Sequence, residues 1–156
     1  MRAARALAGV VVLLAVFSCQ RGAVPARTTV RFWGFGREGE LVREMVPEFE
    51  RLHPDIRIEV QQVPWTAAHE KLLTAFVGDA TPDAAQLGNT WIPEFESLHA
   101  LAPLNDRIAK TAPAIPGDSF PGIWDTNVLR GETWGLPWYV DTRLLFYRTD
   151  LVAAAG

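Results

Sequence analysis

The sequence predicts an α/β fold with a mainly parallel sheet flanked by helices, and three observations support this prediction. The 156 residues fit one domain of about 100–200 residues. With 49% hydrophobic residues, the chain has enough apolar side chains for a packed core, which excludes wholesale disorder. Strand-like and helix-like segments alternate from residue 29 onwards, an order typical of parallel strands joined by helical crossovers that cover both sheet faces.

The first strand and the first helix are expected at residues 29–33 and 40–52. The strand segment is rich in β-branched and aromatic residues, and the glycines that follow it are expected to end the strand. In the helix segment, apolar residues recur at helical spacing, so that one face of the helix is apolar. These residues are Leu41, Met45, Phe49 and Leu52, with Val42 and Val46 beside them.

Four further elements are expected before residue 100. Alternation of apolar and polar residues predicts a half-buried strand at residues 56–60. Thr66 is expected to cap a helix that runs to Gly78. A short apolar strand at residues 83–87 and a short helix at residues 92–98 complete the alternating order.

Beyond residue 101 the pattern weakens, because several prolines and glycines interrupt it. Order is expected to return at residues 132–137 and in a strand at residues 142–147. A last apolar helix begins at Asp150, shortly before the sequence ends. We therefore expect the sequence to be a fragment of a longer protein.

The N-terminal segment has the features of an export signal. Arg2 and Arg5 lie in front of an uncharged run at residues 6–17. This run is shorter than the roughly 20 apolar residues that span a bilayer, and its length is typical of the core of a signal peptide.

The end of this run resembles the bacterial lipobox, in which the peptide is cut before a Cys that then carries the lipid. The matching residues are Val16-Phe17-Ser18-Cys19. We therefore expect a lipoprotein signal peptide at residues 1–18 and a lipid-anchored tether at residues 19–28, with lipidation at Cys19. The protein would then be exported to the periplasm or to the outer face of the cell membrane. A plain secretory signal with an incidental Cys is the alternative.

Composition excludes several other classes of protein. The formal net charge of −3 argues against a nucleic-acid partner, which would require a basic patch. The single Cys excludes a disulfide framework and a multi-cysteine zinc site. His69-Glu70 begins like a zinc-protease motif, but Leu73 stands where the second His is required. We therefore expect no metal and no cofactor.

Aromatic and polar side chains follow three of the expected strands, where ligands of open α/β sheets bind. An indole offers an apolar face to a sugar ring, and planar polar groups bind its hydroxyls, within a pocket of few polar groups. The pattern therefore predicts a carbohydrate site. Its candidate ligand contacts are Trp33, Asn89, Thr90, Trp91, Trp138, Asp141 and Arg143.

Several stretches, taken in their order and spacing, resemble the N-terminal region of family 1 extracellular solute-binding proteins, the sugar-binding lipoproteins of bacterial ABC importers. They are the strand with Phe32-Trp33, the step EFERLHPDIRIEV, the stretch PDAAQLGNTWIPEF and the late stretch GLPWYVDTRLLFYRTDL. The resemblance implies a periplasmic-binding-protein-like lobe. Residues 29–142 would form most of lobe one, and residues 143–156 the crossing strand and the start of a second lobe that is otherwise missing.

The resemblance also implies a function without catalysis. The protein would bind a mono- or oligosaccharide between two lobes and deliver it to the membrane subunits of an ABC permease. It would act as a monomer that contacts the membrane only through its lipid anchor. Asn89, Thr90 and Trp91 match a loop that contacts the sugar, and Asp141 matches a carboxylate that accepts hydroxyl hydrogen bonds. Trp65 is a further, weaker candidate at the mouth of the site.

Simpler interpretations remain for the single residues. Trp33 is also consistent with a core position, Asn89 with a turn that satisfies the backbone, and Asp141 with a surface ion pair to Arg143.

Two other functions are left open. A binding protein of the same fold for a non-sugar solute, such as a glycerol phosphate or a peptide, or for a sensor, is the first alternative. The second is an exported glycoside hydrolase, which needs two carboxylates at a fixed separation. Asp125, Glu132 and Asp141 are the available carboxylates, and their spacing marks no pair.

Overall fold

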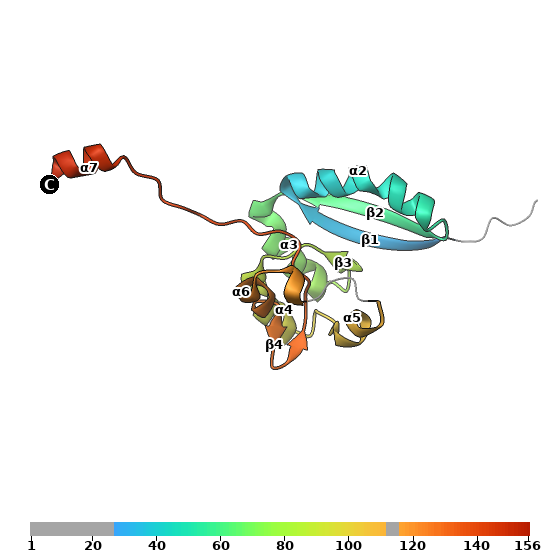
Figure 1. The fold of residues 1–156 in the computed structure, drawn as a ribbon. Coiled ribbons are helices and arrows are strands. Elements are labelled where there is room, and N and C mark those ends of the chain that lie inside the picture. Colours follow the sequence, from blue (N-terminus) through green and yellow to red (C-terminus); the bar gives the residue numbers. More distant parts are fainter. Residues whose placement is uncertain (1–26, 112–115) are drawn as a thin grey trace, which may run out of the picture. The chain divides into compact units, whose positions relative to one another are not determined.

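The structure, a computed structural model, describes residues 27–111 and 116–156. The expected signal peptide, Cys19 and nearly all of the tether lie outside these residues. Contacts divide the chain into unit 1, Met1–Ala85, and unit 2, Gln86–Gly156. The elements of unit 1 are β1 (Thr28–Phe35), α2 (Gly36–Leu52), β2 (Ile56–Val63), α3 (Trp65–Val77) and β3 (Ala84–Ala85) (Figure 1). Those of unit 2 are η1 (Asn89–Trp91), α4 (Ile92–Ser97), α5 (Asn105–Thr111), η2 (Pro116–Asp118), α6 (Pro121–Asp125), β4 (Val128–Leu129), β5 (Glu132–Thr133) and α7 (Thr149–Ala155).

Unit 1 contains a parallel sheet in which β1 is central. The strand order is β2-β1-β3, and β1 pairs in parallel with both neighbours. The registers Phe32↔Val60 and Trp33↔Ala85 bring the carboxyl ends of the three strands to the same edge of the sheet. The α/β fold with a mainly parallel sheet is therefore confirmed.

The helices α2 and α3 lie on opposite faces of this sheet. Successive side chains of a strand point to opposite faces, and Gly34 and Trp33 of β1 contact different helices. A Cβ added to Gly34 would lie 2.6 Å from the Cα of Gly39 in α2. The Trp33 ring instead lies 4.8 Å from the ammonium nitrogen of Lys71 in α3. Figure 1 shows α2 lying along β1 and β2.

The apolar face of α2 is only partly buried against the sheet. Val42 and Val46 are half-buried, one and two turns after the buried Gly39. The row of Leu41, Met45, Phe49 and Leu52 is exposed, with Met45 at 67% and Leu52 at 58%. The valines at the edge of the expected face therefore make the sheet contact, because Gly39 approaches β1 most closely.

Several element boundaries differ from the expected ones. β1 extends two residues further, to Phe35, and α2 begins at Gly36 instead of residue 40. The cap predicted at Thr66 is wrong, because α3 begins at Trp65 after an extended Pro64, without a side-chain cap. The predicted end of this helix at Gly78 is confirmed.

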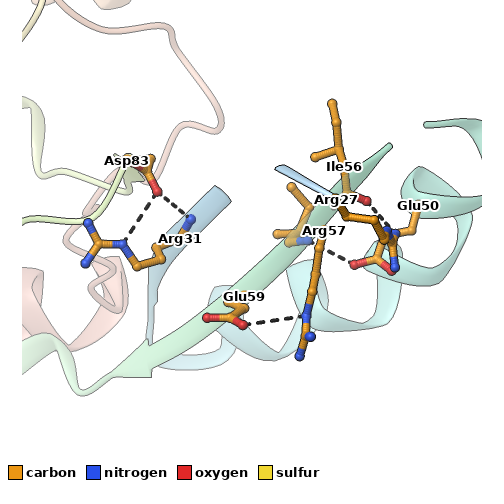
Figure 2. A network of polar contacts seen from close by, with 8 residues as sticks. Arg27, Arg31, Glu50, Ile56, Arg57, Glu59 and Asp83 are labelled. Carbon is orange, nitrogen blue, oxygen red and sulfur yellow. Dashed lines mark hydrogen bonds and ion pairs between the residues drawn. The ribbon is translucent and has the colours of Figure 1, made fainter. Parts of the chain in front are cut away.

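A polar network joins α2 to the edge strand β2 (Figure 2). Glu50 Oε1 accepts a hydrogen bond of 2.9 Å from the Ile58 amide, and Oε2 accepts one of 2.8 Å from Arg27. These two interactions, the amide first, hold the pKa of Glu50 below its ordinary value. Farther along the sheet, Asp83 accepts a hydrogen bond of 2.7 Å from the Arg31 amide and fixes the chain that enters β3 (Figure 2).

Unit 2 consists of short helices and one hairpin around a small apolar core. Its buried apolar residues are Ile92, Phe95 and Trp124. The antiparallel hairpin β4–β5, which the sequence analysis did not predict, turns at Arg130-Gly131, where both φ angles are positive. Arg130 forms an ion pair with the buried Glu96 of α4.

The strand predicted at residues 142–147 is a further correction. In the described part of unit 2, this stretch belongs to no helix or strand, and its residues are all exposed. A strand needs a neighbour that pairs with its backbone groups, and among the described residues none pairs with this stretch. The order expected at residues 132–137 is limited to β5, and the last predicted helix is present as α7. Within residues 27–111 and 116–156, no helix has the length and apolar character to cross a bilayer.

Candidate ligand-binding site

The carboxyl end of β1 is closed by a tight turn that places an aromatic ring beside a carboxylate. Phe35 is completely buried, and its ring contacts Trp65 edge to face at 5.2 Å between centroids. The indole nitrogen of Trp65 donates to Glu38 Oε2 at 3.4 Å. Because 39% of Trp65 is exposed, it is the more accessible of the two candidate indoles of unit 1.

Trp33 is packed between β1 and α3. Only 8% of this residue is exposed, and the Lys71 ammonium lies over its ring. The indole borders an open hollow of about 530 Å³ on the α3 side of the sheet. The hollow is lined by Trp33, Ala67, Glu70, Lys71, Thr74, Ala75 and Ala80. Trp33 therefore has the burial of a core residue, and its contact with ligand stays a prediction.

In unit 2, the turn that opens α4 presents two polar side chains next to an indole. Asn89 and Thr90 are exposed in η1, and in the described chain neither side chain has a hydrogen-bond partner. Trp91 is half-buried and folds back over Gly88, where an added Cβ would lie 3.1 Å from the ring. The turn backbone is closed by the Trp91 amide, which donates to the Gly88 carbonyl at 2.9 Å. The Asn89 side chain therefore does not bond to the turn backbone, which was the simpler interpretation of this residue.

A second aromatic group of unit 2 lies in the segment after β5. Trp138 and Tyr139 are about half-exposed, at 51% and 46%, and their rings meet edge to face at 5.9 Å. The Gln86 side chain, which is 6% exposed, donates to the Tyr139 hydroxyl at 3.3 Å. This contact ties the start of unit 2 to a residue 53 positions later.

Asp141 and Arg143 follow this aromatic pair and are both exposed. In the described part of the chain, no hydrogen bond or ion pair involves either side chain. The surface ion pair considered for them is therefore not formed in this structure. Both charges stand in water, where they remain accessible to a solute.

Six of the seven predicted contact residues thus belong to unit 2, and Trp33 belongs to unit 1. The sequence analysis missed Gln86 and Tyr139 as parts of this region, although both lie in quoted stretches around Asn89 and Asp141. Gln86 directly follows β3, and a polar residue at a strand end was the available signal. Within the described residues, no group of His, Cys, Asp and Glu side chains could hold a metal ion.

Comparison with known proteins identifies relatives over most of the chain. The sugar-binding protein MalE from Xanthomonas citri is 56% identical, with a TM-score of 0.73 over 83% of this chain and 33% of that one. A lipoprotein encoded in the oleD 5′ region of Streptomyces antibioticus is 31% identical over 99% of this chain and 35% of its own length. The diacetylchitobiose-binding protein DasA of Streptomyces coelicolor is 27% identical over 72% of this chain and 25% of its own length.

The chain spans about a third of the length of its most extensive matches. Residues 35–156 match the family described as bacterial extracellular solute-binding protein. This match covers more than half of the chain, and its extracellular description and the lipoprotein relative support the predicted export. The chain belongs to the bacterial extracellular solute-binding protein family.

Proposed function

We propose that this chain is part of the carbohydrate-binding component of a bacterial ABC import system. The observation that carries this proposal is the turn at Asn89, Thr90 and Trp91, in a chain that is 56% identical to a sugar-binding protein. An exposed amide and an exposed hydroxyl beside an indole offer both parts of carbohydrate recognition. The polar groups bind hydroxyls, and the indole covers the apolar face of the ring.

Trp138, Asp141 and Arg143 supply further groups of the same kind. Asp141 accepts hydrogen bonds from sugar hydroxyls, and Arg143 donates to ring or hydroxyl oxygens. Charge-assisted hydrogen bonds of this kind are stronger than those between neutral groups. Because both side chains are already solvated, binding does not require an existing ion pair to break.

The proposed mechanism is binding without chemistry. Sugar docks on the lobe to which this chain contributes, and a second lobe closes over it. Closure is a population shift, which requires that the ligand binds the closed state more tightly than the open one. The closed form then engages the membrane subunits of the permease. We propose a monomer held at the membrane by a lipid on Cys19, in the periplasm or on the outer cell surface.

The two alternatives differ in what supports them. A phosphorylated solute favours clustered cations, and Arg143 is the single cation among the candidate contacts of unit 2. A peptide or a sensor partner has no specific feature of the described residues in its favour. The glycoside hydrolase is excluded, because the family and its relatives are binding proteins and not enzymes.

The test is calorimetric titration of the protein at its natural length with glucose, maltose, cellobiose and diacetylchitobiose, one at a time. We expect at least one sugar to bind, and Asp141→Ala to weaken its binding about threefold to tenfold through the lost hydrogen bond. Asp125→Ala is the matched control, since Asp125 is an exposed Asp of unit 2 outside the candidate site. Binding of glycerol phosphate in place of every sugar would reject the carbohydrate proposal.

A further inference from the structure

A buried amide is joined to an exposed phenol in unit 2. Gln86 is one of the few buried polar residues of the described chain, at 6% exposure. Its side-chain nitrogen donates to the Tyr139 hydroxyl at 3.3 Å. Burying an amide costs free energy unless hydrogen bonds compensate the cost. The hydrogen bond to Tyr139 offsets part of this cost for the Gln86 side chain.

The same contact restrains the Tyr139 ring from outside its own segment, in addition to the ring contact with Trp138. Tyr139 lies in a stretch without helix or strand, and 46% of it is exposed. Trp138 beside it is 51% exposed, and the two ring planes are inclined by 73°. We call this pair the aromatic corner. Its two rings form walls of different orientation, and Tyr139 adds a hydroxyl whose oxygen accepts the hydrogen bond from Gln86.

We propose that Tyr139 is a further ligand contact of the solute-binding site and that Gln86 is its positioning residue. The inference rests on the proposed function, because it assigns a role within that carbohydrate site. A hydroxylated ring fits the aromatic corner, since one wall covers its apolar face while the phenol oxygen bonds a hydroxyl at its edge. Asp141, two residues after Tyr139, lies on the same short segment and offers a second polar contact.

The positioning role follows from the cost of ordering an exposed side chain on binding. Immobilising such a side chain costs about 0.5–1.5 kcal/mol. A hydrogen bond from a buried donor fixes the phenol before the ligand arrives, so that ordering this side chain does not weaken the free energy of binding. Loss of the Gln86 amide is therefore expected to weaken ligand binding through its effect on Tyr139.

The test compares Tyr139→Phe, Gln86→Leu and the double variant in the protein at its natural length, titrated with the four sugars named above. We expect Tyr139→Phe to weaken binding about threefold to tenfold, as the loss of one hydrogen bond does. Gln86→Leu is expected to weaken binding in the parent but to have no further effect when Tyr139 is already Phe. A merely structural Gln86 would lower affinity equally in both backgrounds.

Tyr147→Phe is the matched control, because Tyr147 is the second of the two tyrosines and is 66% exposed outside the aromatic corner. It is expected to bind as the parent does. Parental affinity in Tyr139→Phe would overturn the inference alone, even if Gln86→Leu did not fold. Independent, multiplying losses in the double variant would overturn the positioning role. A parent protein that binds none of the sugars would reject the proposed function, and this inference with it.

Discussion

The turn after β1 depends on a single residue, Gly36. Its φ of +53° lies in the left-handed region, and an added Cβ would lie 2.8 Å from Cδ1 of Trp65. We expect Gly36→Ala to lower the free energy of unfolding by about 1–3 kcal/mol, from backbone strain and from displacement of the indole. Urea unfolding followed by circular dichroism measures the change.

Gly122→Ala serves as the control for this substitution. Gly122 lies within α6, and no atom lies within 4 Å of an added Cβ. Since Ala favours a helix over Gly by about 1 kcal/mol, stability should stay the same or rise. Equal losses in both variants would show that the geometry at Gly36 is not the cause.

Glu50 makes stability depend on pH in a defined direction. The Ile58 amide and Arg27 lower its pKa in the folded state below the ordinary value of 4.5. Its contribution is therefore complete above pH 4.5 and is lost as the pH falls through the lowered folded-state pKa. We expect Glu50→Gln to reduce the free energy of unfolding at pH 7 and to differ less from the parent at pH 3.

Urea unfolding of both proteins at the two pH values tests this expectation. Glu44→Gln, on the exposed side of the same helix, is the matched control, because no hydrogen bond or ion pair within the described residues involves the Glu44 side chain. It should leave the difference between pH 7 and pH 3 as it is in the parent. A Glu50→Gln variant that keeps the full pH dependence of the parent would contradict the role given to the network in Figure 2.

Single residues also mark the limit of what the sequence could predict about the site. The sequence analysis gave Trp33 as a candidate at a strand end and Trp65 as a weaker candidate at the mouth of the site, but it could not distinguish the covered indole from the accessible one. Burial of Trp33 depends on α3 and Lys71, which are separated from it by more than thirty residues. The same reason explains why the sequence analysis missed Gln86, because its partner Tyr139 lies 53 positions away.

Among the elements, α2 has two adjacent apolar rows, of which one packs on the sheet and the other is exposed. Val46 is half-buried on the side of Gly39, whereas Met45 is 67% exposed. We expect Val46→Ala to lower the free energy of unfolding by about 1 kcal/mol, through lost apolar burial. Met45→Ala, its neighbour and control, should change stability by less than about 0.5 kcal/mol. The reverse order in urea unfolding would show that the other row of α2 makes the packing contact.

Helical periodicity predicted that α2 exists and where it ends, because those signals are local. It favoured the row of Leu41, Met45, Phe49 and Leu52, since larger side chains dominate the pattern. The close approach of Gly39 to Gly34 instead turns the smaller valines to the sheet. The strand predicted at residues 142–147 failed for a related reason. Its composition is local, but a strand forms only where another strand pairs with it.

For the whole chain, the alternation of strands and helices was enough to predict the parallel sheet of unit 1. Unit 2 was harder to predict, because its short elements are held by contacts between distant residues. Asn105, for example, accepts a hydrogen bond of 2.8 Å from the Thr133 amide in the hairpin. Its candidate contact residues stay a prediction, which rests on the aromatic and polar residue types that the sequence displays directly.

The 156-residue chain expressed by itself is expected to self-associate through residues 144–147. Leu145 and Phe146 are 90% and 87% exposed in a stretch that pairs with no strand of the described chain. Unpaired backbone groups next to exposed apolar side chains offer a surface on which other chains pair. Sedimentation velocity should show oligomers whose fraction rises with concentration, and Leu145→Glu with Phe146→Glu should shift the distribution toward monomer. Ala109→Glu with Thr111→Glu, on α5, adds the same two charges elsewhere in unit 2. If this control reduced association equally, net charge rather than the exposed segment would be the cause.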